Sequence, residues 1–305
     1  MPAPSESANN STNGRFVEMV RGALAVTARL SPGLAAAVAT RLFLTPRRYP
    51  RPARERALLE RAEPLPREDG LAAWRWGRGP TVLLAHGWAG RGAQLGSFVE
   101  PLVAAGYQVV AFDAPAHGAS PGRRTNLIDM ADALARVAGS VGPLHAVVAH
   151  SFGAAATMVA FSRGLDARSA VFVAPPWSLS EGLNTFAAAL GLSPAVMEGV
   201  RAEIERRVGL SWDAFEGSTL APRMTVPLLV VHDRGDAEVP FASGQALAAA
   251  WPGAELYETY GLGHRRILRD PVVIAASIDR IGRVTPAQRD TTPLERMLDL
   301  EGLRV

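Results

Sequence analysis

A serine between small residues is the strongest chemical signal in the sequence. Ser151 lies in the segment Ala-His-Ser-Phe-Gly (149–153), between an apolar run that predicts a strand and an alanine-rich run that predicts a helix. Small residues on both sides of such a turn let the two backbones pass closely while the serine is held at the tip. The helix N-terminus stabilises negative charge that develops beside the hydroxyl. The pattern therefore indicates a nucleophilic serine rather than a simple helix cap.

A second signal follows the expected strand 81–85, where a His-Gly turn begins at His86. We expect the backbone N–H of Trp88 to face the same end of the sheet as the serine, with the N–H of Phe152 on the other side. Two such donors would form an oxyanion hole. His86 itself is expected to brace its loop through hydrogen bonds, and the side chain of Trp88 fits a pocket wall or the core equally well.

The composition excludes several other kinds of chemistry. The 305 residues contain no cysteine, which excludes disulfides, thiolate nucleophiles and sulfur-ligated metal sites. All 32 basic residues are arginine, so Schiff-base chemistry and a Walker phosphate loop, which need a lysine amine, are excluded as well. No His-Glu-X-X-His run occurs, and we expect neither a metal nor a cofactor.

Basic residues gather near the N-terminus. Residues 41–67 hold eight arginines and three glutamates, whereas the whole chain carries a formal charge of only +3. We interpret this stripe as a solvated helical face with pairs four residues apart. It contains no interleaved aromatic residues for base stacking, so no nucleic-acid partner is expected, and weak contact of the N-terminal helices with an anionic membrane surface is the alternative.

The chain shows neither a signal peptide nor an apolar run of about 18 residues that could span a bilayer. We therefore expect a cytoplasmic protein. The oligomeric state is left open by the sequence.

From residue 71 onward, short apolar runs alternate with longer helical patterns. Most of the runs are continuously apolar, as expected for strands buried on both faces, and the alternation predicts an α/β fold with a doubly wound, mostly parallel sheet. The expected strands are 71–76, 81–85, 109–113, 146–149, 170–174, 228–232 and 255–259, and the expected helices include 95–105, 127–141, 152–163, 244–251 and 271–281.

One interval of about fifty residues breaks this alternation. Ser178 and Glu181 have the spacing of a capping box, and Ser193-Pro194 begins another helix, so we predict a small helical lid over the sheet. The expected organisation is a disordered tail (1–14), a helical N-terminal extension (15–70), a core in two parts (71–176 and 223–285) around the lid (177–222), and a helical C-terminal tail (286–305).

Taken together, these segments resemble the α/β-hydrolase superfamily, in particular its serine esterases and lipases. The resemblance covers about residues 71–285 and is carried by several motifs in the family's order: 86–90, 112–120, 149–153, 232–240 and Gly263-His264. It implies the α/β-hydrolase fold with the lid inserted after the sixth strand, a nucleophile elbow at Ser151, and a catalytic triad in the chain order Ser, Asp, His.

The resemblance also implies which residues complete the triad. Asp236 begins the segment Asp-Ala-Glu-Val-Pro (236–240), where the family places the triad acid. Asp233 is the other candidate, but at the end of a strand it is expected to cap the turn. His264 lies after the last strand, at the place of the family's catalytic histidine, and the other five histidines are expected to be structural.

These assignments predict a hydrolase that cleaves carboxylic esters of small to medium apolar substrates through an acyl-enzyme. The substrate expected is a small-molecule ester, in contact with Trp88, Trp177 and Phe186. The same triad serves thioesterases, lactonases, amidases and C–C bond hydrolases, so these activities stay open. A catalytically silent membrane-surface or interaction module is the alternative from another class.

Overall fold

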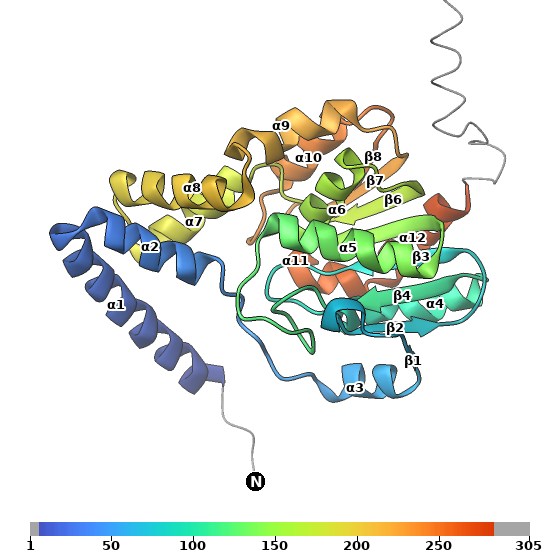
Figure 1. Cartoon of the computed structure of the whole chain (residues 1–305). Helices are drawn as coiled ribbons and strands as arrows, with labels where there is room; N and C mark the ends of the chain where they lie inside the picture. The colour runs from blue at the N-terminus through green and yellow to red at the C-terminus, as the bar shows by residue number, and fades with distance from the viewer. Residues whose placement is uncertain (1–5, 284–305) are drawn as a thin grey trace, which may run out of the picture.

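The computed structural model describes residues 6–283, and one eight-stranded sheet forms the centre of that region (Figure 1). The strand order is β1-β2-β4-β3-β5-β6-β7-β8. The first two pairings, β1 with β2 and β2 with β4, are antiparallel, and all the others are parallel. The strands are β1 Glu63–Pro64, β2 Ala73–Trp76, β3 Thr81–Ala85, β4 Gln108–Phe112, β5 Leu144–His150, β6 Ala167–Val173, β7 Leu228–Asp233 and β8 Glu255–Thr259.

Helices cover both faces of this sheet, as the alternating pattern predicts. One face packs against α5 (Leu127–Val141), α6 (Phe152–Ser162) and α10 (Phe241–Ala250). The other face packs against a second group of helical segments. These are α3 (Ala53–Glu60), η2 (Gly92–Phe98), α4 (Val99–Ala104), η5 (Ile267–Arg269) and α12 (Pro271–Gly282). The doubly wound α/β fold is thereby confirmed.

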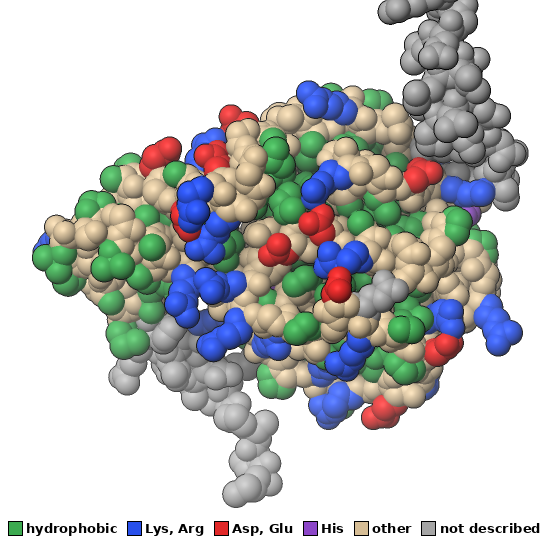
Figure 2. Space-filling view, viewed as in Figure 1, with side chains coloured by type: hydrophobic (Ala, Val, Ile, Leu, Met, Phe, Trp, Pro, Cys, Tyr) green, Lys and Arg blue, Asp and Glu red, His purple; other side chains and the backbone are tan. Residues whose placement is uncertain are grey.

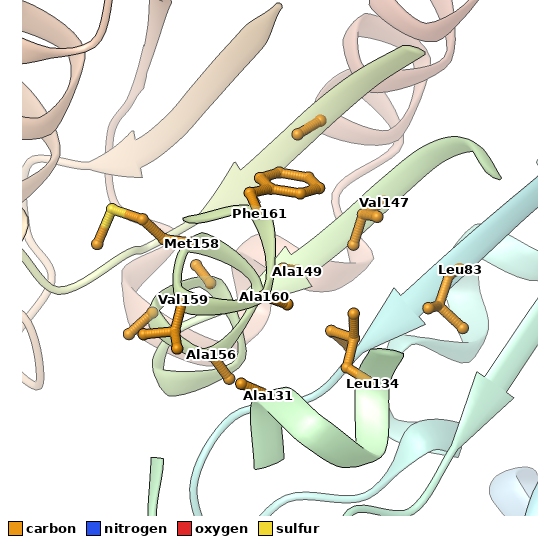
Figure 3. Packing of buried hydrophobic residues seen from close by; sticks show 14 of the residues in the cluster. Leu83, Ala131, Leu134, Val147, Ala149, Ala156, Met158, Val159, Ala160 and Phe161 are labelled. Atoms are coloured by element: carbon orange, nitrogen blue, oxygen red, sulfur yellow. The ribbon is translucent and has the colours of Figure 1, made fainter. Parts of the chain in front are cut away.

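Helix α6 is alanine-rich because it lies at the middle of the sheet, where space is scarce. Ala156 and Ala160 let it approach α5 and strand β5 closely, while Phe161 and Met158 fill the remaining volume (Figure 3). Every residue from Gly153 to Phe161 is buried, so the helix has no solvent-facing side until its last turn. Close packing of this kind holds the residue at the start of the helix in one place.

A helical cap lies to one side of the sheet, inserted between β6 and β7 (Figure 1). Helices α1 (Glu6–Leu30) and α2 (Pro32–Phe43) of the N-terminal extension pack against α7 and α8 of this cap, so the extension and the predicted lid share one hydrophobic cluster. The inserted elements are α7 (Leu179–Leu190), α8 (Pro194–Val208), η3 (Trp212–Phe215), α9 (Gly217–Leu220) and η4 (Ala221–Arg223).

Some arginines of the basic stripe bind the loop after β4 instead of forming a solvated helical face. Arg48 donates to the carbonyl oxygens of Ala116 (2.9 Å), Ser120 (2.7 Å) and Gly122 (2.9 Å). Arg51 pairs with the buried Asp113. Figure 2 shows arginine side chains gathered where the N-terminal helices meet the sheet region. The interpretation as pairs four residues apart is therefore wrong for these residues.

The described ends of the chain differ from the expectation in one respect. Helix α1 begins at Glu6, so the prediction of disorder does not hold for residues 6–14. The polar residues there compete with helix formation, but extending a helix whose later turns already pack on α2 costs less than starting one. The predicted C-terminal tail, 286–305, lies outside the described residues.

None of the helices between residues 6 and 283 combines the length and the apolar character that a bilayer span requires. Weak contact of the N-terminal helices with a membrane surface stays a prediction.

Candidate active site

Ser151 occupies a strained turn between β5 and α6. Its φ of 52° and ψ of −126° lie in a region that side-chain-bearing residues rarely adopt, and its N–H donates to the carbonyl oxygen of Val173 at 2.9 Å. The start of α6 passes close to the end of β3, which explains the glycine two residues after the serine. A β-carbon at Gly153 would lie 2.4 Å from the carbonyl oxygen of His86. The geometry is that of the predicted nucleophile elbow.

Asp236 and His264 contact each other directly. Asp236 lies in the loop after β7, and His264 lies in α11 (Gly263–Arg266), after β8. The Nδ1 of His264 is 2.7 Å from Oδ2 of Asp236, and the carboxylate is fully buried. Its Oδ1 accepts hydrogen bonds from the backbone N–H groups of Glu238 (2.8 Å) and Val239 (3.0 Å). The pair has the arrangement in which a carboxylate orients an imidazole.

The electrostatics of Asp236 keep this carboxylate ionised. Burial acts to raise its pKa, but hydrogen bonds from His232 and His264 outweigh burial and hold the pKa well below the ordinary value. A second histidine therefore belongs to the surroundings of this acid. The Nε2 of His232 donates to the carbonyl oxygen of Val239 at 3.0 Å and lies 3.5 Å from Oδ2 of Asp236.

Asp233, the other candidate acid, has a different set of partners. Its carboxylate accepts hydrogen bonds from the N–H groups of Gly235 and Leu262, both at 2.9 Å, and from the hydroxyl of Thr259 at 2.8 Å. These bonds tie the end of β7 to the loop that leads to His264. Asp233 therefore caps and joins loops, as expected for a carboxylate at this position.

The structure does not join Ser151 to His264 by a hydrogen bond. Within the described residues, the serine hydroxyl has no hydrogen-bond partner. Catalytic hydrogen bonds are often long or misaligned in a free enzyme and shorten only when substrate is bound. The residue before the serine, His150, contacts His264 directly. The ring of His150 is 4.6 Å from that of His264, and its Nε2 donates to the His264 carbonyl oxygen at 3.0 Å.

His150 is a site residue that the sequence reasoning missed. Burial lowers its pKa to about 3, so the ring is neutral near pH 7 and carries its proton on Nε2. The only signal in the sequence was its position next to the serine. The order of residues along the chain does not predict that the residue before the elbow contacts α11.

Two neutral histidines brace the loop that carries Trp88, one of the two predicted oxyanion donors, against the loop after β4. The Nε2 of His86 accepts from the N–H of Ala114 at 2.9 Å, and the Nε2 of His117 accepts from the N–H of Ala89 at 3.0 Å. Burial lowers the pKa of His86 to about 4 and that of His117 to about 3, so both rings stay uncharged acceptors near neutral pH. The expectation that His86 braces its loop agrees with these contacts.

The two residues that carry these donors contact each other through their side chains. The rings of Trp88 and Phe152 meet edge to face with 5.4 Å between their centroids. Phe152 is the first residue of α6, where a backbone N–H has no intrahelical acceptor, and Trp88 lies in the turn after β3. Within the described part of the chain, neither N–H donates to a protein acceptor. Both groups are therefore available to bind a ligand oxygen.

A cavity of about 550 Å³ reaches Ser151. Most of its wall is apolar, and it is built from four parts of the chain: the loops around the serine, the start of α5, the cap, and the end of α2. The sequence left open whether the N-terminal extension packs against the core, covers the pocket or pairs with another subunit, and the end of α2 contributes to this wall. The side chains of the wall include Phe43, Leu44, Trp88, Leu127, Phe152, Leu179, Glu181, Ile204, Val208, Trp212, Phe215 and Glu238.

Of the three predicted substrate contacts, only Trp88 lines this cavity. Trp177 packs against the Gly217 backbone instead, where a β-carbon would lie 2.5 Å from the indole. Phe186 lies behind the wall, with its ring edge to face with that of Phe43 at 5.0 Å. Both expectations were wrong for this cavity because the sequence could not tell which face of the lid turns toward the serine.

Metal-ligating side chains do not cluster in the described residues. No group of three or more histidine, aspartate or glutamate side chains there is placed to hold a metal ion.

The motif order, the sheet and the elbow together identify the family. A model of the alpha/beta hydrolase family matches residues 82–277. The chain belongs to the alpha/beta hydrolase family. In this hydrolase the matched segment runs from β3 to α12 and includes Ser151, Asp236 and His264, whereas α1 and α2 lie outside it.

Solved structures similar to this hydrolase carry several activity names. They include a monoacylglycerol lipase from Paleococcus ferrophilus (22% identity, TM-score 0.56, covering 70% of this chain and 99% of that one). An esterase from Exiguobacterium antarcticum has 14% identity and a TM-score of 0.55, with 70% and 95% covered. A bromoperoxidase from Bacillus anthracis has 19% identity and a TM-score of 0.54, with 70% and 96% covered. At these identities the likeness shows the fold alone. No curated protein matches the sequence.

Proposed function

We propose that this hydrolase cleaves carboxylic esters of small to medium apolar substrates through an acyl-enzyme on Ser151. The observation that carries the proposal is the cavity, which brings a largely apolar wall to a strained serine. The buried pair of Asp236 and His264 supports it, because an imidazole held by a carboxylate is the base that a serine hydroxyl needs. The names of an esterase and a lipase among the similar structures are in keeping with ester cleavage.

Each residue has a defined part in the proposed reaction. The hydroxyl of Ser151 attacks the ester carbonyl carbon while His264 takes its proton. The carboxylate of Asp236 holds the proton on Nδ1 of His264 and stabilises the imidazolium that forms. The N–H groups of Trp88 and Phe152 bind the oxyanion, each contributing on the order of 3 kcal/mol to transition-state stabilisation.

The collapse of the tetrahedral intermediate breaks the bond to the leaving oxygen, which takes the proton from His264 and departs as the alcohol. The acyl group then stays on Ser151. A water molecule loses a proton to His264 as it attacks this acyl group, and the serine leaves with that proton, releasing the carboxylic acid. Atoms balance with water as the only co-reactant.

The test is Ser151→Ala, with hydrolysis of 4-nitrophenyl butyrate as the readout. We expect kcat to fall by about 10³-fold or more, while the circular dichroism spectrum and the unfolding midpoint are kept. Ser162→Ala, at the other end of α6, is the matched control, because Ser162 lies outside the cavity. A fluorophosphonate should also label the wild type on the peptide that contains Ser151. Near-wild-type hydrolysis by folded Ser151→Ala would refute the proposed function.

A further inference from the structure

The imidazole of His150 has its hydrogen bond to the residue that is the proposed base. Its Nε2 donates to the backbone carbonyl oxygen of His264 at 3.0 Å, whereas its Nδ1 is buried and has no partner among the described residues. His150 is only 4% exposed. A phenyl ring would fill the same space without an unpaired buried nitrogen, which costs free energy. The bond to His264 is therefore what the imidazole adds at this position.

The segment that carries His264 has little local structure of its own. Helix α11 contains four residues, about a single turn, and so short a helix is not stable by itself. The glycines on either side of Leu262, Gly261 and Gly263, have φ values of 71° and 63°, in the left-handed region that favours glycine. The position of the His264 imidazole must therefore come from contacts with other parts of the chain.

The contact from His150 originates in a central strand of the sheet. His150 is the last residue of β5, which pairs with β3 on one side and with β6 on the other, where His150 aligns with Val173. The next residue is Ser151, whose N–H is bonded to the carbonyl oxygen of Val173. The hydrogen bond of His150 therefore links the segment that carries the proposed base to the turn that carries the proposed nucleophile.

The ring of His150 has two further neighbours in the site. Its centroid is 4.6 Å from that of the His264 ring, and the two planes are inclined by 48°. Gly87, next to Trp88, also passes close to it. A β-carbon at Gly87 would lie 3.3 Å from Nδ1 of His150 and 3.0 Å from the β-carbon of Ser151. The ring therefore packs near the loop of one oxyanion donor as well as against the base.

The neutral state of the ring suits this location. Burial, and after it the nearby His264, lower the pKa of His150 to about 3. In the proposed reaction His264 becomes an imidazolium, and a second cation beside it would oppose that charge. A neutral ring contacts His264 without this cost.

We propose that His150 is a positioning residue for His264, and that its hydrogen bond to the His264 backbone holds the imidazole where it takes the proton of Ser151. The inference rests on the proposed function, because the position of His264 matters for turnover only if His264 is the base.

A second histidine of the same strand is the matched control. His145 lies near the other end of β5, and its Nε2 is 3.1 Å from the backbone carbonyl oxygen of Ile281, on α12. The two residues thus share the strand and the kind of contact, but His145 has no contact with the proposed triad. His145→Phe should keep the wild-type kcat and KM.

The kinetic test separates the hydrogen bond of His150 from its ring. His150→Phe keeps a ring but cannot donate, whereas His150→Gln keeps a donor at the same number of bonds from the backbone and has no ring. For 4-nitrophenyl butyrate we expect kcat to fall about ten- to hundredfold in His150→Phe, because a small displacement of the base slows proton transfer. KM should change less, since His150 is outside the cavity wall. His150→Gln should recover part of kcat.

Three kinetic outcomes would overturn the inference. They are a wild-type kcat in folded His150→Phe, a His150→Gln variant no more active than His150→Phe, and an equal loss of kcat in His145→Phe. The proposed function is decided separately by Ser151→Ala. If Ser151→Ala loses hydrolysis while His150→Phe keeps the wild-type kcat, the positioning role fails and the proposed function stands.

A spectroscopic test needs no turnover. The proton between Nδ1 of His264 and the ionised Asp236 lies in a charge-assisted hydrogen bond, and we expect a downfield proton resonance from it that is absent in Asp236→Asn. His150→Phe should shift or broaden this resonance, and His145→Phe should leave it in place. An unchanged resonance in His150→Phe would overturn the inference.

If the His150 variants do not fold, the wild type alone still gives an answer. The nitrogen NMR signals of His150 should be those of a neutral ring protonated on Nε2 at pH 7 and at pH 5, with slow exchange of that proton. A His150 ring that titrates in this range, or that carries its proton on Nδ1, could not make the bond as described and would overturn the inference.

Discussion

The ring of His232 fills the space beside Gly244, where a β-carbon would lie 2.4 Å from Nδ1. Gly244 is on α10, and His232 is in β7, so this glycine lets the helix pass over the ring. The opposite nitrogen of the ring bonds the carbonyl oxygen of Val239 and lies 3.5 Å from Asp236. His232 therefore acts as a positioning residue for the proposed triad acid.

Gly244→Ala should displace His232 and, through it, the carboxylate of Asp236. We expect kcat for 4-nitrophenyl butyrate to fall about tenfold or more, with a smaller change in KM, because the base is misaligned while the cavity wall is kept. Gly139→Ala is the matched control, since it is also a helical glycine but has open space around it. That control should keep activity and raise the free energy of unfolding by about 0.5–1 kcal/mol. Equal kcat for Gly244→Ala and the wild type would contradict the positioning role.

Asp236→Asn and Asp233→Asn separate the two candidate acids. Asp236→Asn removes the charge that orients His264, so we expect kcat to fall by about 10³- to 10⁴-fold with a modest change in stability. Asp233→Asn weakens the bonds to Gly235, Thr259 and Leu262, so its main effect should be on the urea unfolding midpoint. The assignment would be reversed if Asp233→Asn gave the larger loss of kcat in a protein as stable as the wild type.

Phe43→Ala tests whether the N-terminal extension shapes the substrate cavity. The phenyl ring forms part of the wall, so its removal should enlarge the cavity and move the optimum of a 4-nitrophenyl ester series toward longer acyl chains. The measurement is kcat/KM from acetate to decanoate. Leu34→Ala, an exposed residue of the same helix, should leave the profile as it is. An unchanged optimum in Phe43→Ala would show that acyl chains do not reach α2.

Three buried histidines should make the fold sensitive to mild acid. Burial lowers the pKa of His86 to about 4 and those of His117 and His150 to about 3, whereas the unfolded chain titrates near 6.5. Below pH 6.5 the unfolded state therefore binds protons that the folded state does not, and stability is lost as the pH falls from about 6.5 toward 4. Each ring contributes up to about 1.4 kcal/mol per pH unit within that window.

The measurement is the free energy of unfolding in urea at pH 7, 6 and 5. His117→Gln keeps an acceptor for the N–H of Ala89 and should remove about a third of the slope that these rings cause. His145→Gln, in contact with the backbone of Ile281, controls for the substitution itself. A free energy that does not fall between pH 7 and pH 5 would show that these rings are not buried in neutral form.

Local patterns in the sequence were enough to predict the fold and the turn at Ser151. The expected strand 81–85 and helix 127–141 agree with β3 and α5 to the residue, because buried strands and amphipathic helices carry their own periodicity. The turn at Ser151 was predictable because the small residues that it requires, Ala149 and Gly153, lie close to the serine in the sequence. The backbone there leaves no room for larger residues. The strand β1 was missed, since two residues are too short for any pattern.

The tertiary structure decided what surrounds the serine. The apolar stripes on α2 and on the lid predict that one face of each helix is buried. They do not predict which surface buries it, because the hydrophobic effect is non-directional. Only packing shows that Phe43 enters the cavity wall while Phe186 lies behind it and Trp177 covers Gly217. The same holds for the start of α7, where the spacing of Ser178 and Glu181 predicts a capping box. In the structure the N–H groups of Leu179 and Ser180 donate instead to the carboxylate of Glu216, which comes from a later segment. The sequence by itself determined the elements and the turn at Ser151, and long-range packing determined the shape of the cavity.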